Sequence, residues 1–267
     1  MDEDAEHTII YVDMLGFEAF TKSNPTRLVQ SGPDECGFSG SRTSPLQTQY
    51  RRFHRILESR IAEERLCGGI LAMLFSDCAY LDAGNSVRAG LIATELMRQF
   101  LLAHVPVRMG IGRGTFYAFG FSTEILGSTI ISRSQFAGTA VINAYAAERS
   151  GGKGMRAFVH ASLGPERHLI ERRVKMLELR PKPNDAATWE LDYLYETRPA
   201  QKQPPADQSD RKLFEAVKSM KNTKASWGVR RQYIETHKAL NRMRQRNGRE
   251  LVPFRQLKST YSEPGWF

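Results

Sequence analysis

The sequence predicts an α+β fold in which helices cover one face of a sheet. Short apolar runs rich in β-branched and aromatic residues recur along the chain and indicate buried strands. Segments with apolar residues every three or four positions lie between these runs and indicate helices. The resulting order is strand, helix, hairpin, helix, strand, helix and later strands, which is close to the βαββαβ (ferredoxin-like) plan. At 267 residues and 41% hydrophobic composition, the chain is large enough to bury one sizeable core.

The first half of the chain accounts for the first strand, one helix and the hairpin. Residues 7–12 (HTIIYV) form a short apolar strand, and residues 23–45 are rich in Gly, Ser and Pro, which predicts a loop. Residues 69–75 and 78–81 are the two arms of the hairpin. A helix over 46–65 is predicted from the apolar residues Tyr50, Phe53, Leu57 and Ile61.

The next segments complete the sheet. Asn85 is a good N-cap for a helix that buries Leu91, Ile92, Leu96 and Phe100. Beyond it, we expect a strand over 106–111, a helix over 137–148, and strands over 157–160, 174–179 and 188–195.

Composition marks a boundary near residue 198. Residues 198–210 (RPAQKQPPADQSD) have three prolines and no apolar periodicity, which predicts a linker. We therefore expect a catalytic domain over 1–197 and a basic helical extension over 211–267. Residues 221–249 hold nine basic residues and one acid, with Trp227 and Tyr233 as candidate stacking groups for nucleic acid. Because no helix-turn-helix or finger signature accompanies them, we expect a solvated face on a dimer-bracing helix instead.

Bulk composition narrows the class of protein. The net charge of +9 favours polyanionic partners, including nucleoside triphosphates, without choosing among them. No apolar run approaches the ~20 residues of a membrane span, and the acidic N-terminus does not resemble a signal peptide, so we expect a cytoplasmic protein without a membrane partner. The three cysteines show no paired spacing, which argues against a disulfide framework or a zinc site.

Two aspartates occupy positions that the predicted topology brings together. Asp13 directly follows the first strand, and Asp77 lies at the turn of the hairpin. In a βαββαβ sheet these two points are neighbours, and paired carboxylates are costly unless a cation neutralises them. Mg²⁺ and Mn²⁺ prefer such oxygen ligands. The pair therefore predicts a two-metal site, although either Asp alone is equally typical of a turn or a helix cap.

These residues resemble the class III adenylyl and guanylyl cyclases. Residues 12–17 (VDMLGF) are similar to the family's first metal-binding segment, and residues 75–78 (FSDC) to its second, where Gly-Asp is usual. Residues 107–114 (VRMGIGRG) resemble the strand that follows, and residues 138–141 (GTAV) the late active-site helix. The resemblance covers roughly residues 8–195.

The resemblance implies a mechanism. Asp13, Asp77 and the Met14 carbonyl would bind two Mg²⁺ or Mn²⁺ ions, and the ribose 3′-oxygen would attack the α-phosphate and expel pyrophosphate. Backbone N–H groups of Leu15, Gly16 and Phe17 would cradle phosphate oxygens. The family's site lies between two subunits, so the resemblance also implies a homodimer with composite active sites.

Several positions depart from the family's pattern. The resemblance places Met73 and Gln135 where adenine-using cyclases carry a Lys and an Asp, and an amide at 135 suits the edge of a pyrimidine. Alternatively, Met73 is plain strand core and Gln135 plain surface. The usual catalytic Asn and Arg positions hold Ile142 and Ala146, which leaves Asn143, Arg149 and Arg113 as candidates to stabilise the transferring phosphate.

These departures resemble a subgroup, the Pycsar pyrimidine cyclases of bacterial antiphage defence, which share the pattern of residues 138–145. This resemblance implies conversion of UTP to cyclic UMP, or of CTP to cyclic CMP, as a signal to a separate effector. Tyr50 is a candidate contact for the pyrimidine or a packing residue. Two alternatives remain: an adenylyl or guanylyl cyclase with an unusual base pocket, and an inactive cyclase-like binding module.

Overall fold

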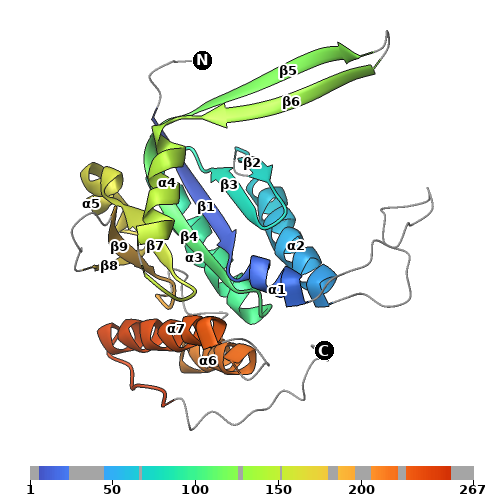
Figure 1. Cartoon of the computed structure of the whole chain (residues 1–267). Helices are drawn as coiled ribbons and strands as arrows, with labels where there is room; N and C mark the ends of the chain where they lie inside the picture. The colour runs from blue at the N-terminus through green and yellow to red at the C-terminus, as the bar shows by residue number, and fades with distance from the viewer. Residues whose placement is uncertain are drawn as a thin grey trace.

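A seven-stranded sheet forms the centre of the protein in the computed structural model, which describes residues 6–23, 45–65, 68–125, 129–150, 152–179, 186–195, 206–221 and 227–253. The strand order is β2-β3-β1-β4-β7-β9-β8, and each neighbouring pair is antiparallel except β4 with β7 (Figure 1). The strands are β1 (Glu6–Met14), β2 (Leu71–Leu74), β3 (Cys78–Asp82), β4 (Val107–Thr115), β7 (Ala157–His160), β8 (Lys175–Glu178) and β9 (Ala187–Asp192).

The predicted α+β class and βαββαβ order are confirmed in the first half of the chain. α2 (Pro45–Arg65) joins β1 to β2, and α3 (Ser86–Leu102) joins β3 to β4. Asn85 caps α3 as expected, because its side-chain oxygen accepts a hydrogen bond from the Arg88 N–H at 2.9 Å. β3 pairs with β1, so the hairpin lies beside the first strand.

Helices cover both faces of the sheet, which differs from the predicted single face. Val107, Met109 and Ile111 of β4 are buried in the same core as α2 and α3. The intervening residues Gly110 and Gly112 face α4 (Thr139–Ser150), and a Cβ added at Gly112 would lie 2.3 Å from the Ala144 nitrogen. The absence of side chains on this face of β4 therefore lets α4 pack backbone to backbone against the strand.

A two-stranded ribbon was not foreseen. β5 (Tyr117–Ile125) and β6 (Thr129–Ala137) pair only with each other among the described strands, and they project from the sheet between β4 and α4 (Figure 1). The helix expected from residue 137 accordingly begins at Thr139. A short helix, α1 (Phe17–Ser23), follows β1, and residues 24–44 of the expected loop lie outside the described residues.

The C-terminal helices complete the core. α6 (Ala206–Lys221) begins inside the segment predicted as a linker, so residues 206–210 are helical, and residues 198–205 lie outside the described residues. Leu213 and Phe214 of α6 are buried in the same core as α3. Asp210 holds the end of α7 (Trp227–Arg246), accepting hydrogen bonds from Arg244 at 2.6 Å and Arg249 at 2.7 Å. Between β7 and β8 lie a 3₁₀ helix (Ala161–Glu166) and α5 (Arg167–Ile170).

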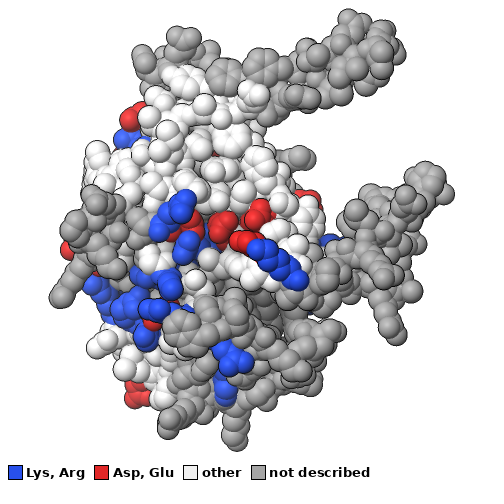
Figure 2. Space-filling model, in the orientation of Figure 1, with Lys and Arg blue, Asp and Glu red and all other residues white. Residues whose placement is uncertain are grey.

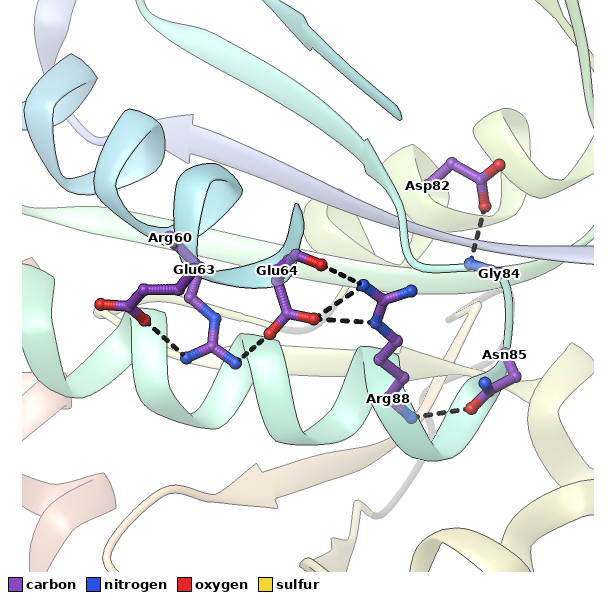
Figure 3. A network of polar contacts seen from close by, with 7 residues as sticks. All are labelled: Arg60, Glu63, Glu64, Asp82, Gly84, Asn85 and Arg88. Atoms are coloured by element: carbon purple, nitrogen blue, oxygen red, sulfur yellow. Dashed lines mark hydrogen bonds and ion pairs between the residues drawn. The ribbon is translucent and has the colours of Figure 1, made fainter. Parts of the chain in front are cut away.

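An ion-pair network ties α2 to α3. Glu64, near the end of α2, accepts hydrogen bonds from Arg60 of its own helix and from Arg88 of α3, the latter at 2.8 Å (Figure 3). Glu64 is buried, so both guanidinium groups stabilise its charge. The network fixes how the two helices pack on the face of the sheet opposite α4. None of the described helices is long and apolar enough to cross a membrane.

Candidate metal and nucleotide site

Asp13 and Asp77 meet at one edge of the sheet. Asp13 stands opposite Cys78 in the β1–β3 ladder, and the Met14 N–H donates to the Asp77 carbonyl at 2.8 Å. The Ser76 hydroxyl donates to the Asp77 carboxylate at 3.0 Å. Both aspartates are half-buried. The predicted proximity follows from the topology, because antiparallel pairing brings the end of β1 beside the turn that joins β2 to β3.

The carboxylate of Asp13 lies in an electronegative setting. Burial is the main cause that raises its pKa to about 7, and the negative charges of Glu148 and Asp77 add to the shift. Arg108 and a hydrogen bond from the Tyr11 hydroxyl, at 3.3 Å, act in the opposite direction. Figure 2 shows acidic side chains near the middle of this face with basic side chains on both sides. A bound divalent cation would relieve the repulsion among these carboxylates.

The donor set fits an ion that is shared with a substrate. Across the described residues, no group of three or more His, Cys, Asp and Glu side chains is arranged to hold a metal ion. Two carboxylates and the Met14 carbonyl are oxygen donors, which Mg²⁺ and Mn²⁺ prefer. Mg²⁺ commonly takes one or two protein carboxylates and completes its shell with phosphates and water. Asp13, Met14 and Asp77 therefore suit such an ion rather than an all-protein metal cage.

Arg108 is a site residue that the sequence analysis missed. It stands directly opposite Asp13 in the β1–β4 ladder, and its guanidinium is held by an ion pair with the buried Glu148 of α4. It also donates to the Gly152 carbonyl at 3.1 Å. Its alternation with Val107 and Met109 marks it as a polar residue on the α4 face. Only the pairing of β4 with β1, however, places it beside the aspartates.

The turn after β1 supplies fewer free donors than expected. The Leu15 N–H already donates to the Pro106 carbonyl at 2.8 Å, so the expectation that it cradles a phosphate is wrong for this structure. Gly16 adopts a positive φ of 75°, which lets the chain turn sharply from β1 into α1. Phe17 is the first residue of α1. For the N–H groups of Gly16 and Phe17, the role of cradling phosphate oxygens stays a prediction.

Two of the three candidates for the transferring phosphate are committed elsewhere. Arg113 lies five residues beyond Arg108 along β4 and pairs with Glu6 at 2.6 Å and Glu166 at 3.0 Å. Asn143 donates its amide to the Arg113 carbonyl at 2.8 Å. Within one chain, both lie away from Asp13, so their role at the transferring phosphate stays a prediction.

Arg149 stays close to the acidic edge of the sheet. It is exposed and donates to the Tyr145 hydroxyl at 2.9 Å. The Tyr145 ring in turn contacts Tyr11, with 5.5 Å between the ring centroids. Since Tyr11 donates to Asp13, Arg149 belongs to the same surface as the aspartates.

The base-reading candidates fall on two faces of the sheet. Met73 stands opposite Tyr80 and packs in an aromatic cluster on the α4 face, where the rings of Tyr80 and Phe136 are 4.9 Å apart. Gln135 is exposed, and it directly precedes Phe136 of this cluster in the sequence. Tyr50 instead packs on His54 of α2, a helix on the α3 face, so one chain does not bring it to Met73.

Comparisons with known proteins give structural neighbours only. No protein-family model matches the sequence, and no curated protein does either. Similar solved structures include the guanylyl cyclase domain of a rhodopsin fusion protein (RhoGC) from the fungus Blastocladiella emersonii. That domain is 11% identical, with coverage of 70% of this chain and 94% of that domain and a TM-score of 0.47.

Two further neighbours are also cyclases. The guanylate cyclase domain of RhGC from Catenaria anguillulae, solved with GTP, is 14% identical, with coverage of 72% and 98% and a TM-score of 0.48. An adenylate cyclase from Trypanosoma brucei is 14% identical, with coverage of 73% and 92% and a TM-score of 0.47. At TM-scores below 0.5 these likenesses assign no activity, so a function has to rest on the residues of the site.

Proposed function

We propose that this protein is a nucleotide cyclase that converts a nucleoside triphosphate to its 3′,5′-cyclic monophosphate and pyrophosphate. The observation that carries the proposal is the meeting of Asp13 and Asp77 at one sheet edge with Arg108 beside them. A triphosphate site requires acidic groups that bind cations and a basic group that binds phosphate oxygens. In a purely structural ion-pair cluster, a half-buried Asp is expected to form a salt bridge. Asp13 is half-buried and forms none among the described residues.

The residues divide between cation binding and phosphate binding. Asp13, Asp77 and the Met14 carbonyl would hold two Mg²⁺ or Mn²⁺ ions, which when bound would supply positive charge to stabilise the substrate's alkoxide and phosphate oxygens. Arg108, positioned by Glu148, meets oxygens of the triphosphate, as do the N–H groups of Gly16 and Phe17. The 3′-oxygen gives its proton to solvent water and bonds to the α-phosphorus. The bond from the α-phosphorus to the bridging oxygen breaks, and pyrophosphate leaves.

We further propose a pyrimidine substrate, with UTP favoured over CTP. Met73 offers no strong hydrogen bond to a purine, and the exposed amide of Gln135 offers both a donor and an acceptor. The aromatic cluster of Tyr80 and Phe136 lies beside Met73 and supplies a flat apolar wall. The product would signal to a separate effector, as the resemblance to the antiphage pyrimidine cyclases implies.

A homodimer with composite sites fits the exposed apolar groups on the α4 face. Phe75 is 44% exposed, Tyr145 40% and Ile142 65%. Exposed apolar side chains gathered near polar groups are typical of interaction surfaces. In such a dimer Arg149 and Gln135 of one subunit would face the aspartates of the other, which accounts for their exposure in the single chain.

The test is incubation of the purified protein with each of ATP, GTP, CTP and UTP and with Mn²⁺ or Mg²⁺, followed by mass-spectrometric identification of products. We expect cyclic UMP and pyrophosphate in equal amounts, and loss of at least 100-fold in rate for Asp13→Asn. Asp82→Asn, the same change at the far end of β3, serves as the matched control and should retain activity.

The outcomes separate the alternatives. Product from ATP or GTP alone would overturn the pyrimidine assignment and leave an adenylyl or guanylyl cyclase. No product from any triphosphate, with a folded protein, would overturn the enzymatic proposal. The inactive binding module is favoured by one observation, that Asn143 and Arg113 are engaged within the fold, and it would then be the better account.

A further inference from the structure

The solvent face of α7 is predominantly basic. Seven residues between 230 and 246 are exposed, five of them are Lys or Arg, and none is acidic: Arg230, Arg231, Ile234, Lys238, Arg242, Gln245 and Arg246. At about 100° per residue these positions share one side of the helix. Figure 2 shows basic side chains gathered at the lower left, over α7 and the adjoining edge of the sheet. We call these seven residues the α7 basic face.

The fold holds this face rigidly. The opposite side of α7 is buried in the main core through Tyr233, Leu240 and Met243. Gln232 and Thr236 accept hydrogen bonds from the N–H groups of Gly154 at 2.6 Å and Met155 at 2.8 Å. The helix is therefore fastened to the loop after α4 as well as to the core, and its exposed charges have a fixed spacing.

Nearby acids do not neutralise the α7 basic face. Glu235 pairs with Lys238 at 3.0 Å, and Glu190 lies 3.6 Å from Arg242 while also binding Arg156. Arg231 left aside, four cations of this face (Arg230, Lys238, Arg242 and Arg246) therefore stand against these two acids among the described residues, and one of the acids is shared with a buried arginine. Exposed Lys153, on the loop that α7 holds, adds a further charge beside the helix. This excess favours a polyanionic partner.

We propose that the α7 basic face binds the phosphate backbone of double-stranded nucleic acid without reading its sequence. From residue 230 to residue 246 the helix rises about 24 Å, at 1.5 Å per residue. One strand of a duplex presents a phosphate about every 3.4 Å, so several phosphates lie within reach of this row of charges. The binding goes beyond the proposed cyclase activity and does not depend on it.

The chemistry of the face argues against other polyanions. Ile234 is the one apolar side chain among the seven exposed residues, so the face has no apolar band to enter a lipid surface. It equally lacks the cluster of aromatic anchors that stable protein partners use. Tyr233, a candidate stacking group from the sequence, is only 6% exposed and packs in the core, so base stacking through it is excluded. Among the described side chains, contacts to phosphates remain, while the side chain of Trp227, the other predicted stacking group, lies outside the described residues.

The experiment measures binding of the full chain to fluorescein-labelled 20-base-pair DNA and RNA duplexes of random sequence, by fluorescence anisotropy between 50 and 200 mM salt. With four to five phosphates contacted, we expect the logarithm of the binding constant to fall with the logarithm of salt with a slope of about −4. The variant Lys238→Glu/Arg246→Glu should bind at least 10-fold more weakly, with a shallower slope of about −2.

Arg55→Glu/Lys212→Glu is the matched control, because it makes the same change in charge at exposed positions of α2 and α6. It should retain most of the binding, and thermal melting should show that both variants fold. Equal losses in the two variants would show a mere net-charge effect and overturn the proposal. So would a salt slope near zero, or binding to phosphatidylserine vesicles in preference to both duplexes. Asp13→Asn should bind the duplexes normally, which separates this proposal from the cyclase proposal.

Discussion

At the level of single residues, burial raises the pKa of two carboxyl groups in this sheet, those of Asp13 and Asp192. Asp13 is half-buried at the acidic edge, where a cation is expected to compensate its charge. Asp192, at the end of β9, is fully buried and is stabilised by hydrogen bonds instead. The Asn247 amide donates to its carboxylate at 2.9 Å and the Leu194 N–H at 3.0 Å. The cost of burying a carboxylate thus indicates a candidate site at Asp13 and a structural role at Asp192.

Asp192 gives a pH dependence of stability with a definite sign. Burial raises its pKa to about 6, above the ~3.9 of an unfolded Asp, so the folded state prefers the protonated form. Its contribution to the free energy of unfolding is present below about pH 4 and is lost as the pH rises through 6. We expect the free energy of unfolding of the wild type, relative to Asp192→Asn, to fall by roughly 3 kcal/mol between pH 4 and 7. Urea unfolding at several pH values measures this difference, and parallel pH profiles for the two proteins would contradict it.

At the level of elements, the contact between β4 and α4 organises the candidate site. α4 carries Glu148, Tyr145 and Arg149, and it reaches the aspartates only because Gly110 and Gly112 let it lie against the strand. A Cβ at Gly110 would stand 1.9 Å from the Ala144 carbonyl oxygen, a backbone atom that no rotamer change can move. The position of the whole helix therefore depends on two missing side chains.

Gly112→Ala tests this dependence. The added methyl would lie 2.3 Å from the Ala144 nitrogen, so α4 must shift, and we expect a loss of about 2–3 kcal/mol in stability together with loss of activity. Gly164→Ala is the matched control, since its Cβ would meet the nearest atom, on Trp189, at an ordinary 3.5 Å. Chemical denaturation and the four-nucleotide assay provide the readouts. A Gly112→Ala protein as stable as the control would show that the helix adapts freely.

At the level of the whole molecule, one core joins parts of the chain that composition separates. α6 and α7 bury Phe214 and Leu240 in the same core as α3, so these two helices pack onto the sheet domain. Buried Arg244, bonded to Asp210, closes this junction. The exposed apolar side chains Phe75, Ile142 and Tyr145 lie on the opposite side of the sheet, around α4.

The proposed homodimer makes a prediction for that surface. Ile142 is 65% exposed, so Ile142→Glu should leave the chain folded, while a charge buried at a dimer interface would be costly. We expect a monomer by sedimentation velocity and loss of cyclase activity at concentrations where the wild type is dimeric. Leu251→Glu, a change at a comparably exposed position after α7, should leave the dimer intact. A monomeric wild type with full activity would sink the composite-site proposal.

Local patterns in the sequence determined the strands of the main sheet, the capped helix α3 and the neighbouring positions of Asp13 and Asp77, because these depend on short-range periodicity and on the order of elements, whereas the ribbon of β5 and β6 was missed. Tertiary structure alone decided that α4 lies on the second face, that Arg108 stands beside Asp13, and that Leu15, Asn143 and Arg113 are engaged elsewhere. Those facts depend on strand register and on backbone contacts between segments far apart in the chain. A three-residue pattern such as Gly-Ile-Gly or Val-Arg-Met permits such contacts but does not identify the partner segment.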